Sequence, residues 1–209
     1  GVQLNSLYYE AGATGVNAFT SSDMTVYSAN MPSHKLELFF YLEAERMHRS
    51  VLREFYKERE VVLEERRRAV ASRSRRIWEQ RDALVWEAVP YRNPNLGWES
   101  DLHGITRQDM FEYYRTYYVP NNAALVLTGD ITLSRAMHFA DQYFGKIERA
   151  PAPPPIPTRN AIAAVDKTLY AQERELPSVL INYQSVAAHH VDRTALEALA
   201  SWLSSSSGP

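Results

Sequence analysis

The charged run KEREVVLEERRR, residues 57–68, lies inside a long predicted helix and decides how the rest of the chain is interpreted. At about 100° per residue, Glu58 and Glu65 fall within roughly 20° of one another, two turns apart on one face. Val61 lies on the same side, so the pattern places two carboxylates in an apolar stripe. Burying an unpaired carboxylate is costly, so we expect this pair to be ion-paired, hydrogen-bonded or bound to a metal. The alternative, which this stretch alone favours, is an ordinary helix with solvated ion pairs.

Composition excludes several classes of partner and site. The chain has 209 residues, 45% of them hydrophobic, enough to bury a core in one large domain or one and a half smaller ones. A formal net charge of −2, with both signs mixed along the chain, gives no case for nucleic acid as partner. No apolar run approaches the roughly 18 residues of a membrane span. Because cysteine is absent, any metal site would need histidine and carboxylate ligands.

Hydrophobic periodicity and turn residues predict an α+β fold, mostly an antiparallel sheet with helices packed on one face. The expected helices cover residues 2–10, 34–50, a stretch from about 53, and then 77–88, 106–119, 133–144 and 192–203. The expected strands cover residues 17–20, 24–29, 123–128, 167–174 and 178–185.

Particular residues set the boundaries of these elements. Gly12 is expected to stop the first helix, and Ser33 is a plausible N-cap for the second. The second helix carries Glu43 on the side of its apolar residues. Thr106 and Asp109 resemble a capping box that opens a later helix. The regularity of the charged helix fades through the arginine-rich segment 66–76.

The apolar run at residues 123–128 ends at a Gly-Asp turn and predicts a strand buried on both faces. Residues 150–157 contain five prolines, which is typical of a stiff extended connection. We therefore expect an N-terminal domain over residues 1–149, a linker over 150–160, and the start of a second domain over 161–209. The last segment is too short to form a core alone, so the chain is expected to stop inside that domain.

Three stretches together resemble the pitrilysin/insulinase family of zinc metallopeptidases, which includes the mitochondrial processing peptidases. The first, residues 15–27, matches the N-A-x-T and D-x-T-x-Y pattern of the family's hairpin. The second is EREVVLEE at residues 58–65, and the third is YYVPNN at 117–122 running into LVLTGD at 125–130. Their order and the helices between them make the resemblance strong over residues 10–150.

The resemblance implies a zinc site. The family binds zinc through two histidines of an inverted H-x-x-E-H helix and a glutamate far downstream, and the glutamate of the motif activates the metal-bound water. By motif position Glu65 is the downstream ligand, and Glu58 is a supporting carboxylate near the site. No H-x-x-E-H occurs in this sequence. The expectation is therefore an incomplete metallopeptidase-type domain that lacks its first strands and the H-x-x-E-H helix, followed by a second, similar domain.

The resemblance also implies a role for the hairpin. In the family its strand lies at a sheet edge near the metal and pairs with an extended peptide. Asn17, Ala18, Phe19 and Thr20 are then substrate-binding residues. The alternative is that they simply form a strand, with Asn17 making local hydrogen bonds.

Three functional hypotheses follow. The first is a fragment, itself inactive, of a zinc endopeptidase that cleaves peptides or unfolded polypeptide segments held between this half and a C-terminal half or a homologous subunit. The second is a non-catalytic homologue that serves as a scaffold or substrate-recognition subunit. The third, a helical protein-interaction domain, does not explain the hairpin. The family resemblance slightly favours a bacterial periplasmic or secreted location.

Overall fold

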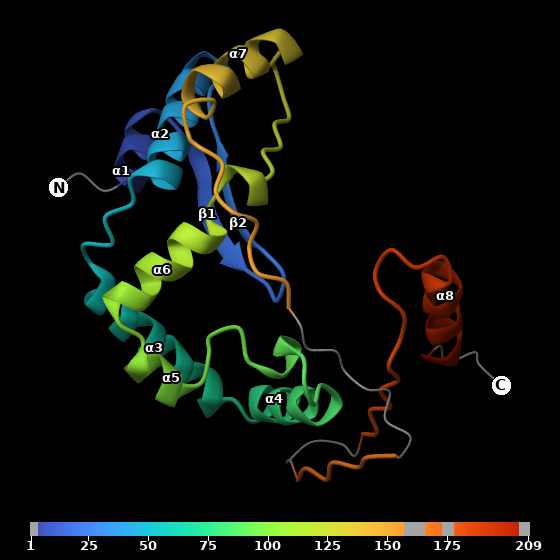
Figure 1. Cartoon of the computed structure of the whole chain (residues 1–209). Helices are drawn as coiled ribbons and strands as arrows, with labels where there is room; N and C mark the ends of the chain where they lie inside the picture. The colour runs from blue at the N-terminus through green and yellow to red at the C-terminus, as the bar shows by residue number, and fades with distance from the viewer. Residues whose placement is uncertain (1–3, 157–165, 173–177, 205–209) are drawn as a thin grey trace. The chain divides into compact units, whose positions relative to one another are not determined.

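The structure is a computed structural model that describes residues 4–156, 166–172 and 178–204. Its chain forms two compact units, Gly1–Ser72 with Asn93–Pro157, and Arg73–Arg92 with Thr158–Pro209. Among the described residues, eight α-helices and one two-stranded antiparallel sheet make the fold α+β, as predicted (Figure 1). The expected sheet is larger than the observed one, since only two strands are found in this part of the chain. None of its helices combines the length and the hydropathy that a membrane span requires.

The first unit contains most of the elements. They are α1 (Leu4–Glu10), β1 (Thr14–Thr20), β2 (Thr25–Asn30), the 3₁₀ helix η1 (Ser33–Lys35), α2 (Leu36–His48), α3 (Phe55–Ala71), α5 (Glu99–Gly104), α6 (Arg107–Tyr117), η3 (Pro120–Asn122) and α7 (Leu133–Tyr143).

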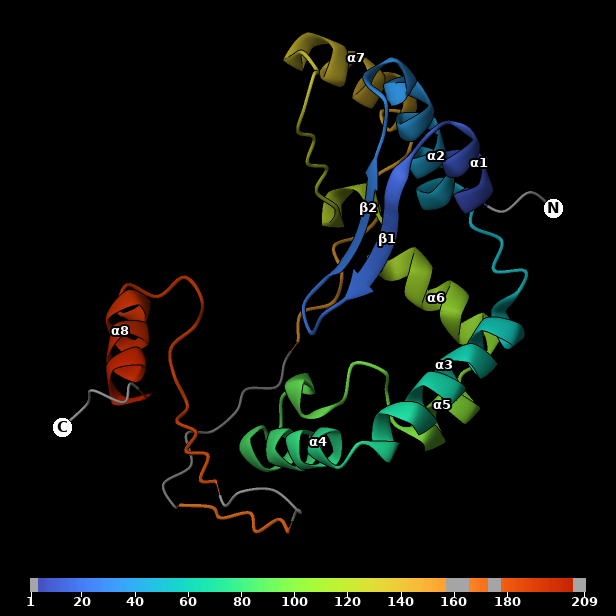
Figure 2. The same ribbon diagram turned by 180° about the vertical axis from the view of Figure 1, so that it is seen from behind.

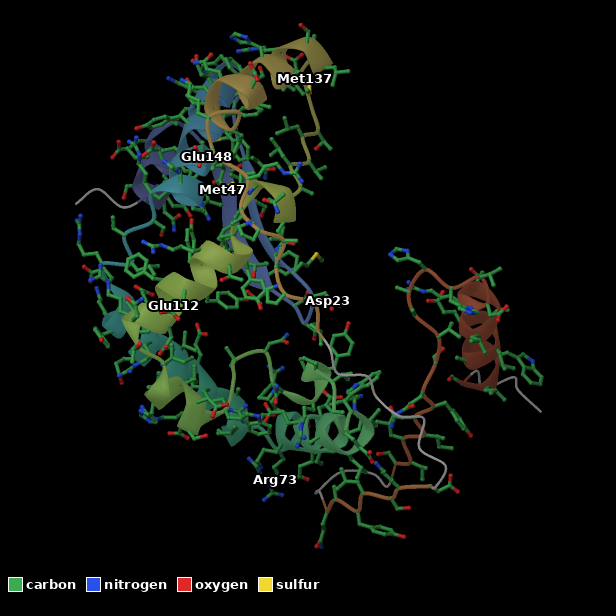
Figure 3. The ribbon with its side chains drawn as sticks, in the orientation of Figure 1. Asp23, Met47, Arg73, Glu112, Met137 and Glu148 are labelled. Carbon is green, nitrogen blue, oxygen red and sulfur yellow. The ribbon has the colours of Figure 1, made fainter. Side chains whose placement is uncertain are left out.

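The predicted hairpin is confirmed, and its register determines which backbone groups of β1 are not hydrogen-bonded to β2. Ser21 N–H donates to the Met24 carbonyl at 2.8 Å and closes the turn. Opposite residue pairs in an antiparallel ladder alternate between hydrogen-bonded and non-hydrogen-bonded. Counted from the Ser21–Met24 pair, the Ala18–Tyr27 and Thr20–Thr25 pairs are therefore the non-hydrogen-bonded ones. The N–H and C=O groups of Ala18 and Thr20 consequently point away from β2, toward the open edge of β1. Figure 3 labels Asp23 near the tip of this hairpin.

The main core of the first unit lies where α1 and α2 meet the hairpin. Tyr8, Ala13 and Leu42 are buried together there. Gly12 has a φ of 82°, a conformation that glycine adopts without strain, and it ends α1 as predicted. Figure 2 shows α2 lying between α1 and α7. The fully buried Phe40 of α2 extends this packing toward α7, with ring centroids 5.7 Å from Phe139 and 6.1 Å from Phe144.

Helices α3 and α5 pack side by side (Figures 1 and 2). Leu63 of α3 is fully buried, and Leu102 of α5 is 8% exposed. The Arg59 guanidinium donates to the carbonyl of His103, in the last turn of α5, and to the carbonyl of Ile105, directly after this helix. Three positions that share one side of α3 (59, 63 and 66) therefore form its packed face.

The predicted capping box opens α6. Thr106 Oγ1 accepts a hydrogen bond from Asp109 N–H at 3.2 Å, and Asp109 Oδ2 accepts from Thr106 N–H at 2.8 Å. Two of the N–H groups that a helix start leaves unpaired are satisfied in this way.

We expect Thr106→Ala to lower the free energy of unfolding by about 1 kcal/mol, because one N-cap acceptor is lost.

The hydrogen bonds from Thr106 also lower the pKa of Asp109. Since the folded-state pKa lies below the unfolded one, this contribution is present above about pH 4 and is lost as the pH falls through the folded-state value. Urea unfolding between pH 2 and 6 should show a smaller acid-dependent loss of stability for Asp109→Asn than for the wild type. Identical pH profiles would contradict the assignment.

The second unit contains α4 (Arg73–Val85), the 3₁₀ helix η2 (Pro90–Arg92) and α8 (Arg193–Ser204). Trp86 and Tyr91 pack edge to face near η2, with ring centroids 5.4 Å apart. Lys167 donates to the Leu84 carbonyl at 3.2 Å and pairs with the Glu87 carboxylate. These contacts hold the segment from residue 166 against the end of α4.

The boundaries of three predicted helices are corrected by the structure. Ser33 does not cap α2, because it begins η1 with Pro32 at its N-cap position and no side-chain capping bond forms. The segment 66–76 is helical apart from a break at Ser72, and α4 begins at residue 73 rather than about 77 and ends at 85 rather than 88. The short helix α5 was not predicted at all.

The predicted strands beyond the hairpin are wrong for the part of the chain that the structure describes. Residues 123–128 are in no strand, and Val126 is 80% exposed, not buried on both faces. Residues 167–172 and 178–185 are not in strands either, and 173–177 lie outside the described residues. A strand depends on a pairing partner, and apolar β-forming residues do not supply one by themselves.

Candidate functional site

The carboxylates of Glu58 and Glu65 lie on one side of α3, as predicted, but that side is not buried. Glu58 and Glu65 are both exposed, and Val61 between them is 47% exposed. The prediction that these carboxylates lie in a buried apolar stripe is therefore wrong. The buried face of α3 is the one that carries Leu63 and Arg66, which packs toward α5. The apolar residues of α3 are too few to show from spacing alone which side is covered.

The other glutamates within α3 are paired with arginines. Glu60 lies 3.6 Å from Arg59, and Glu64 receives Arg68 Nε at 3.0 Å and Arg67 Nη1 at 3.6 Å. Glu58 and Glu65, in contrast, form no side-chain hydrogen bond or ion pair with any described residue. Both carboxylates are accessible, and neither is neutralised within the described chain.

The described residues do not complete a metal site. They contain no group of three or more His, Cys, Asp or Glu side chains placed to hold a metal ion. A zinc site normally uses three or four protein ligands, so Glu65 and Glu58 fit part of a ligand set and no more.

The hairpin residues singled out by the sequence lie together on β1. Asn17 Oδ1 accepts a hydrogen bond from Ala18 N–H at 2.9 Å, so the local hydrogen bonding considered for Asn17 is present. Phe19 is 51% exposed, and Thr20 Oγ1 lies 3.2 Å from Thr25 Oγ1. Four consecutive exposed residues on an edge strand can pair with an extended peptide. None of them is joined to Glu58 or Glu65 by a hydrogen bond or an ion pair among the described residues.

A polar cluster beside the hairpin was missed by the sequence analysis. The Tyr8 hydroxyl donates to Glu43 Oε1, which also receives Arg46 Nη2 at 3.0 Å. The Arg46 guanidinium lies 4.2 Å from the centroid of the Tyr27 ring. One signal was present in the sequence, because Glu43 is an acidic residue on the apolar side of its helix. Its partners come from other elements, and no local pattern identifies them.

Burial changes the acidity of the tyrosines around this cluster. It raises the pKa of Tyr8 and of Tyr27 far above the ordinary value of 10.0, and it raises the pKa of Tyr114 to about 12. Tyr114 also donates its hydroxyl hydrogen bond to the Arg46 carbonyl. These phenols are therefore neutral donors at physiological pH.

We expect Tyr114→Phe to change how stability depends on alkaline pH. Because the folded-state pKa is raised above the unfolded value, the hydroxyl's contribution is complete below pH 10 and is lost as the pH rises through about 12. Urea unfolding measured between pH 9 and 12 should therefore give a shallower decline for the variant. If the two curves run parallel, Tyr114 is not one of the groups that drive alkaline unfolding.

Comparison with known proteins gives these features a context. Residues 104–209 match the family model described as the peptidase M16 inactive domain. The chain is 28% identical over 204 residues to the zinc protease PqqE of Helicobacter pylori, a match that covers 90% of this chain and 46% of that protein. It is 24% identical over 147 residues to the probable mitochondrial-processing peptidase subunit beta of Schizosaccharomyces pombe, covering 68% of this chain and 32% of that protein. The crystal structure of a protease from Helicobacter pylori superposes with a TM-score of 0.68 at 26% identity, over 74% of this chain and 38% of the other.

The chain thus spans less than half the length of these relatives. The resemblance to the pitrilysin/insulinase family is confirmed, since relatives named as zinc protease and processing peptidase match 90% and 68% of this chain. The family model itself covers half of the chain. The chain therefore belongs to the peptidase M16 family, the pitrilysin/insulinase family of metallopeptidases.

Proposed function

We propose that this chain is part of a zinc-dependent endopeptidase that hydrolyses peptides or unfolded polypeptide segments. In such enzymes the metal supplies a water molecule activated for attack on the peptide bond. The observation that carries the proposal is the state of α3, whose other glutamates are paired with arginines while Glu58 and Glu65 remain unpaired on one face. Two free carboxylates at seven-residue spacing suit cation binding and contribute nothing evident to the packing of this chain.

Glu65 has the role of a metal ligand in this proposal, and Glu58 supports it two turns earlier on the helix. A carboxylate ligand must be ionised and free to bind, and Glu65 has no competing arginine among the described residues. Glu58 adds negative charge on the same side and can accept a hydrogen bond from a neighbouring ligand. The proposal needs further ligands beside Glu65, because the described residues contain no group of three or more His, Cys, Asp or Glu side chains that could hold a metal ion.

The open edge of β1 is proposed to hold the substrate as an added strand. Ala18 and Thr20 present N–H and C=O groups that are not used by β2. Binding by main-chain hydrogen bonds places little demand on substrate sequence, which suits a peptidase of unfolded segments. The Ala18 N–H donates a hydrogen bond to Asn17 Oδ1, so the Asn17 side chain must rotate away before this N–H can bind a peptide. Asn17, Ala18, Phe19 and Thr20 are the substrate-binding residues of this proposal.

The domain division belongs to the same proposal. It divides the sequence into a metallopeptidase-type domain over residues 1–149, a linker over 150–160 and the beginning of a second domain over 161–209. Residues 73–92 nevertheless belong to the second compact unit by their contacts. The matches cover 46% and 32% of the two relatives, which supports a partner half supplied by the same polypeptide or by a homologous subunit. A bacterial periplasmic or secreted location stays a prediction.

The test compares this chain with the complete parent polypeptide, using an unfolded fluorogenic peptide as substrate and added Zn²⁺. We expect the chain alone to be inactive and the parent to hydrolyse the peptide until a chelator removes the metal. An inactive parent that still binds the peptide would instead favour a non-catalytic recognition subunit. The absence of a three-ligand group among the described residues is the observation that favours this second candidate. Hydrolysis that resists chelation would contradict both.

A further inference from the structure

A pocket of about 160 Å³ lies beside β1, between the hairpin and the helices α1 and α2. Asn17 and Ala18 line it from β1, and Tyr27 lines it from β2. On the helix side it is lined by Glu43 and Arg46. The strand proposed to hold a peptide is therefore also a wall of a polar pocket.

Ala18 lines this pocket with a small side chain. It pairs directly with Tyr27, so the two side chains share the face of the sheet that meets Arg46. Its methyl group is exposed and small, and a larger side chain at this position would extend into the space. A peptide residue opposite Ala18, on the open edge of β1, would direct its own side chain to the same face.

The lining of the pocket is polar and has no net formal charge. Glu43 and Arg46 are paired at 3.0 Å, with only 16% and 22% of their side chains exposed. The phenols of Tyr8 and Tyr27 are neutral. Arg46 Nε is buried and has no hydrogen-bond acceptor among the described residues. The pocket thus offers donors and an acceptor but no counter-charge for an ionic group, which would be costly to move there from water.

We propose that this pocket is a subsite for one side chain of the bound peptide, and that it selects a small uncharged hydrogen-bonding residue such as serine, threonine or asparagine. The proposal rests on the β1 edge described under the proposed function. Glu43 and Arg46 supply the hydrogen-bonding groups that determine which peptide side chain is preferred. The small Ala18 side chain leaves space for that peptide side chain to enter the pocket.

The experiment measures binding of fluorescent extended peptides to this chain, identical except for one central residue: glycine, threonine, asparagine, leucine, lysine or aspartate. The wild type should bind the threonine and asparagine peptides about fivefold to tenfold more tightly than the glycine peptide, as expected for a satisfied hydrogen bond. Ala18→Leu fills the pocket and should remove this preference, so that the threonine and asparagine peptides bind no more tightly to the variant than the glycine peptide does. Ser22→Leu, which adds the same bulk at the exposed hairpin turn, is the matched control and should keep the preference.

A second variant tests the charge balance without changing shape. Glu43→Gln leaves the Arg46 charge uncompensated, so the aspartate peptide should become the preferred one. Circular dichroism reports whether each variant is folded. If all peptides bind equally to the wild type, or if Ala18→Leu weakens every peptide alike, the subsite is refuted and the β1 edge stands. Absence of binding by any peptide refutes both the subsite and the edge.

Discussion

Replacing Glu65 by glutamine in the complete parent protein is expected to abolish zinc retention while leaving the fold intact. The amide has the same shape but no negative charge, and a neutral oxygen is a poor ligand for Zn²⁺ beside other protein ligands. Because Glu65 is exposed and unpaired in α3, the substitution breaks no contact within the described chain. A loss of zinc affinity of at least about 100-fold is expected, exceeding that of a supporting residue. Metal analysis after dialysis, together with circular dichroism, measures both quantities.

The neighbouring glutamate supplies the control for this experiment. Glu64→Gln removes a charge one residue away, but Glu64 is engaged with Arg67 and Arg68 and faces a different direction. Its zinc content should equal that of the wild type. Glu58→Gln should give an intermediate loss of about 10- to 100-fold, as expected for a residue that supports a ligand. Unchanged zinc content in Glu65→Gln would remove the basis of the metal-ligand assignment.

Replacing Phe40 by alanine is expected to lower the free energy of unfolding by about 3–5 kcal/mol, the range for removing a large buried aromatic side chain. Phe40 is fully buried and packs against Phe39, Phe139 and Phe144, so it joins α2 to α7 and to the segment after α7. The surrounding rings cannot close the space fully, and a cavity remains. Urea unfolding followed by tryptophan fluorescence and circular dichroism measures the change.

Met137→Ala is the matched control on α7, because this side chain is 61% exposed (Figure 3 labels it). It should change the free energy of unfolding by less than about 0.5 kcal/mol, as is usual at the surface. Should Phe40→Ala prove as mild as Met137→Ala, the contact between α2 and α7 contributes little to the stability of the first unit.

Local chemistry made several elements predictable. The hairpin follows from β-branched and aromatic residues around a Ser-Ser-Asp turn, and α6 follows from the Thr106–Asp109 capping box, whose groups satisfy one another within four residues. Gly12 ends α1 for the same kind of local reason. The predicted strand at residues 123–128 was wrong because pairing requires a partner that no local pattern provides.

The candidate site divides in the same way. Helical geometry places Glu58 and Glu65 on one face whatever the surroundings, and the motifs around them identify the family. Their exposure was not predictable, since it depends on α5 covering the opposite side of α3. The Glu43–Arg46 pocket was not predictable from the sequence either, because the Tyr8 hydroxyl contacts Glu43 although the two residues are 35 positions apart in the chain.

The sequence by itself determined the periodicity of the helices, the position of the hairpin turn and the spacing of the two free carboxylates, because each depends on backbone geometry within a few residues. Only the tertiary structure decided which face of α3 is covered and which side chains meet beneath Ala18. Those outcomes depend on contacts between segments far apart in the chain, where packing selects among faces that the sequence leaves equivalent.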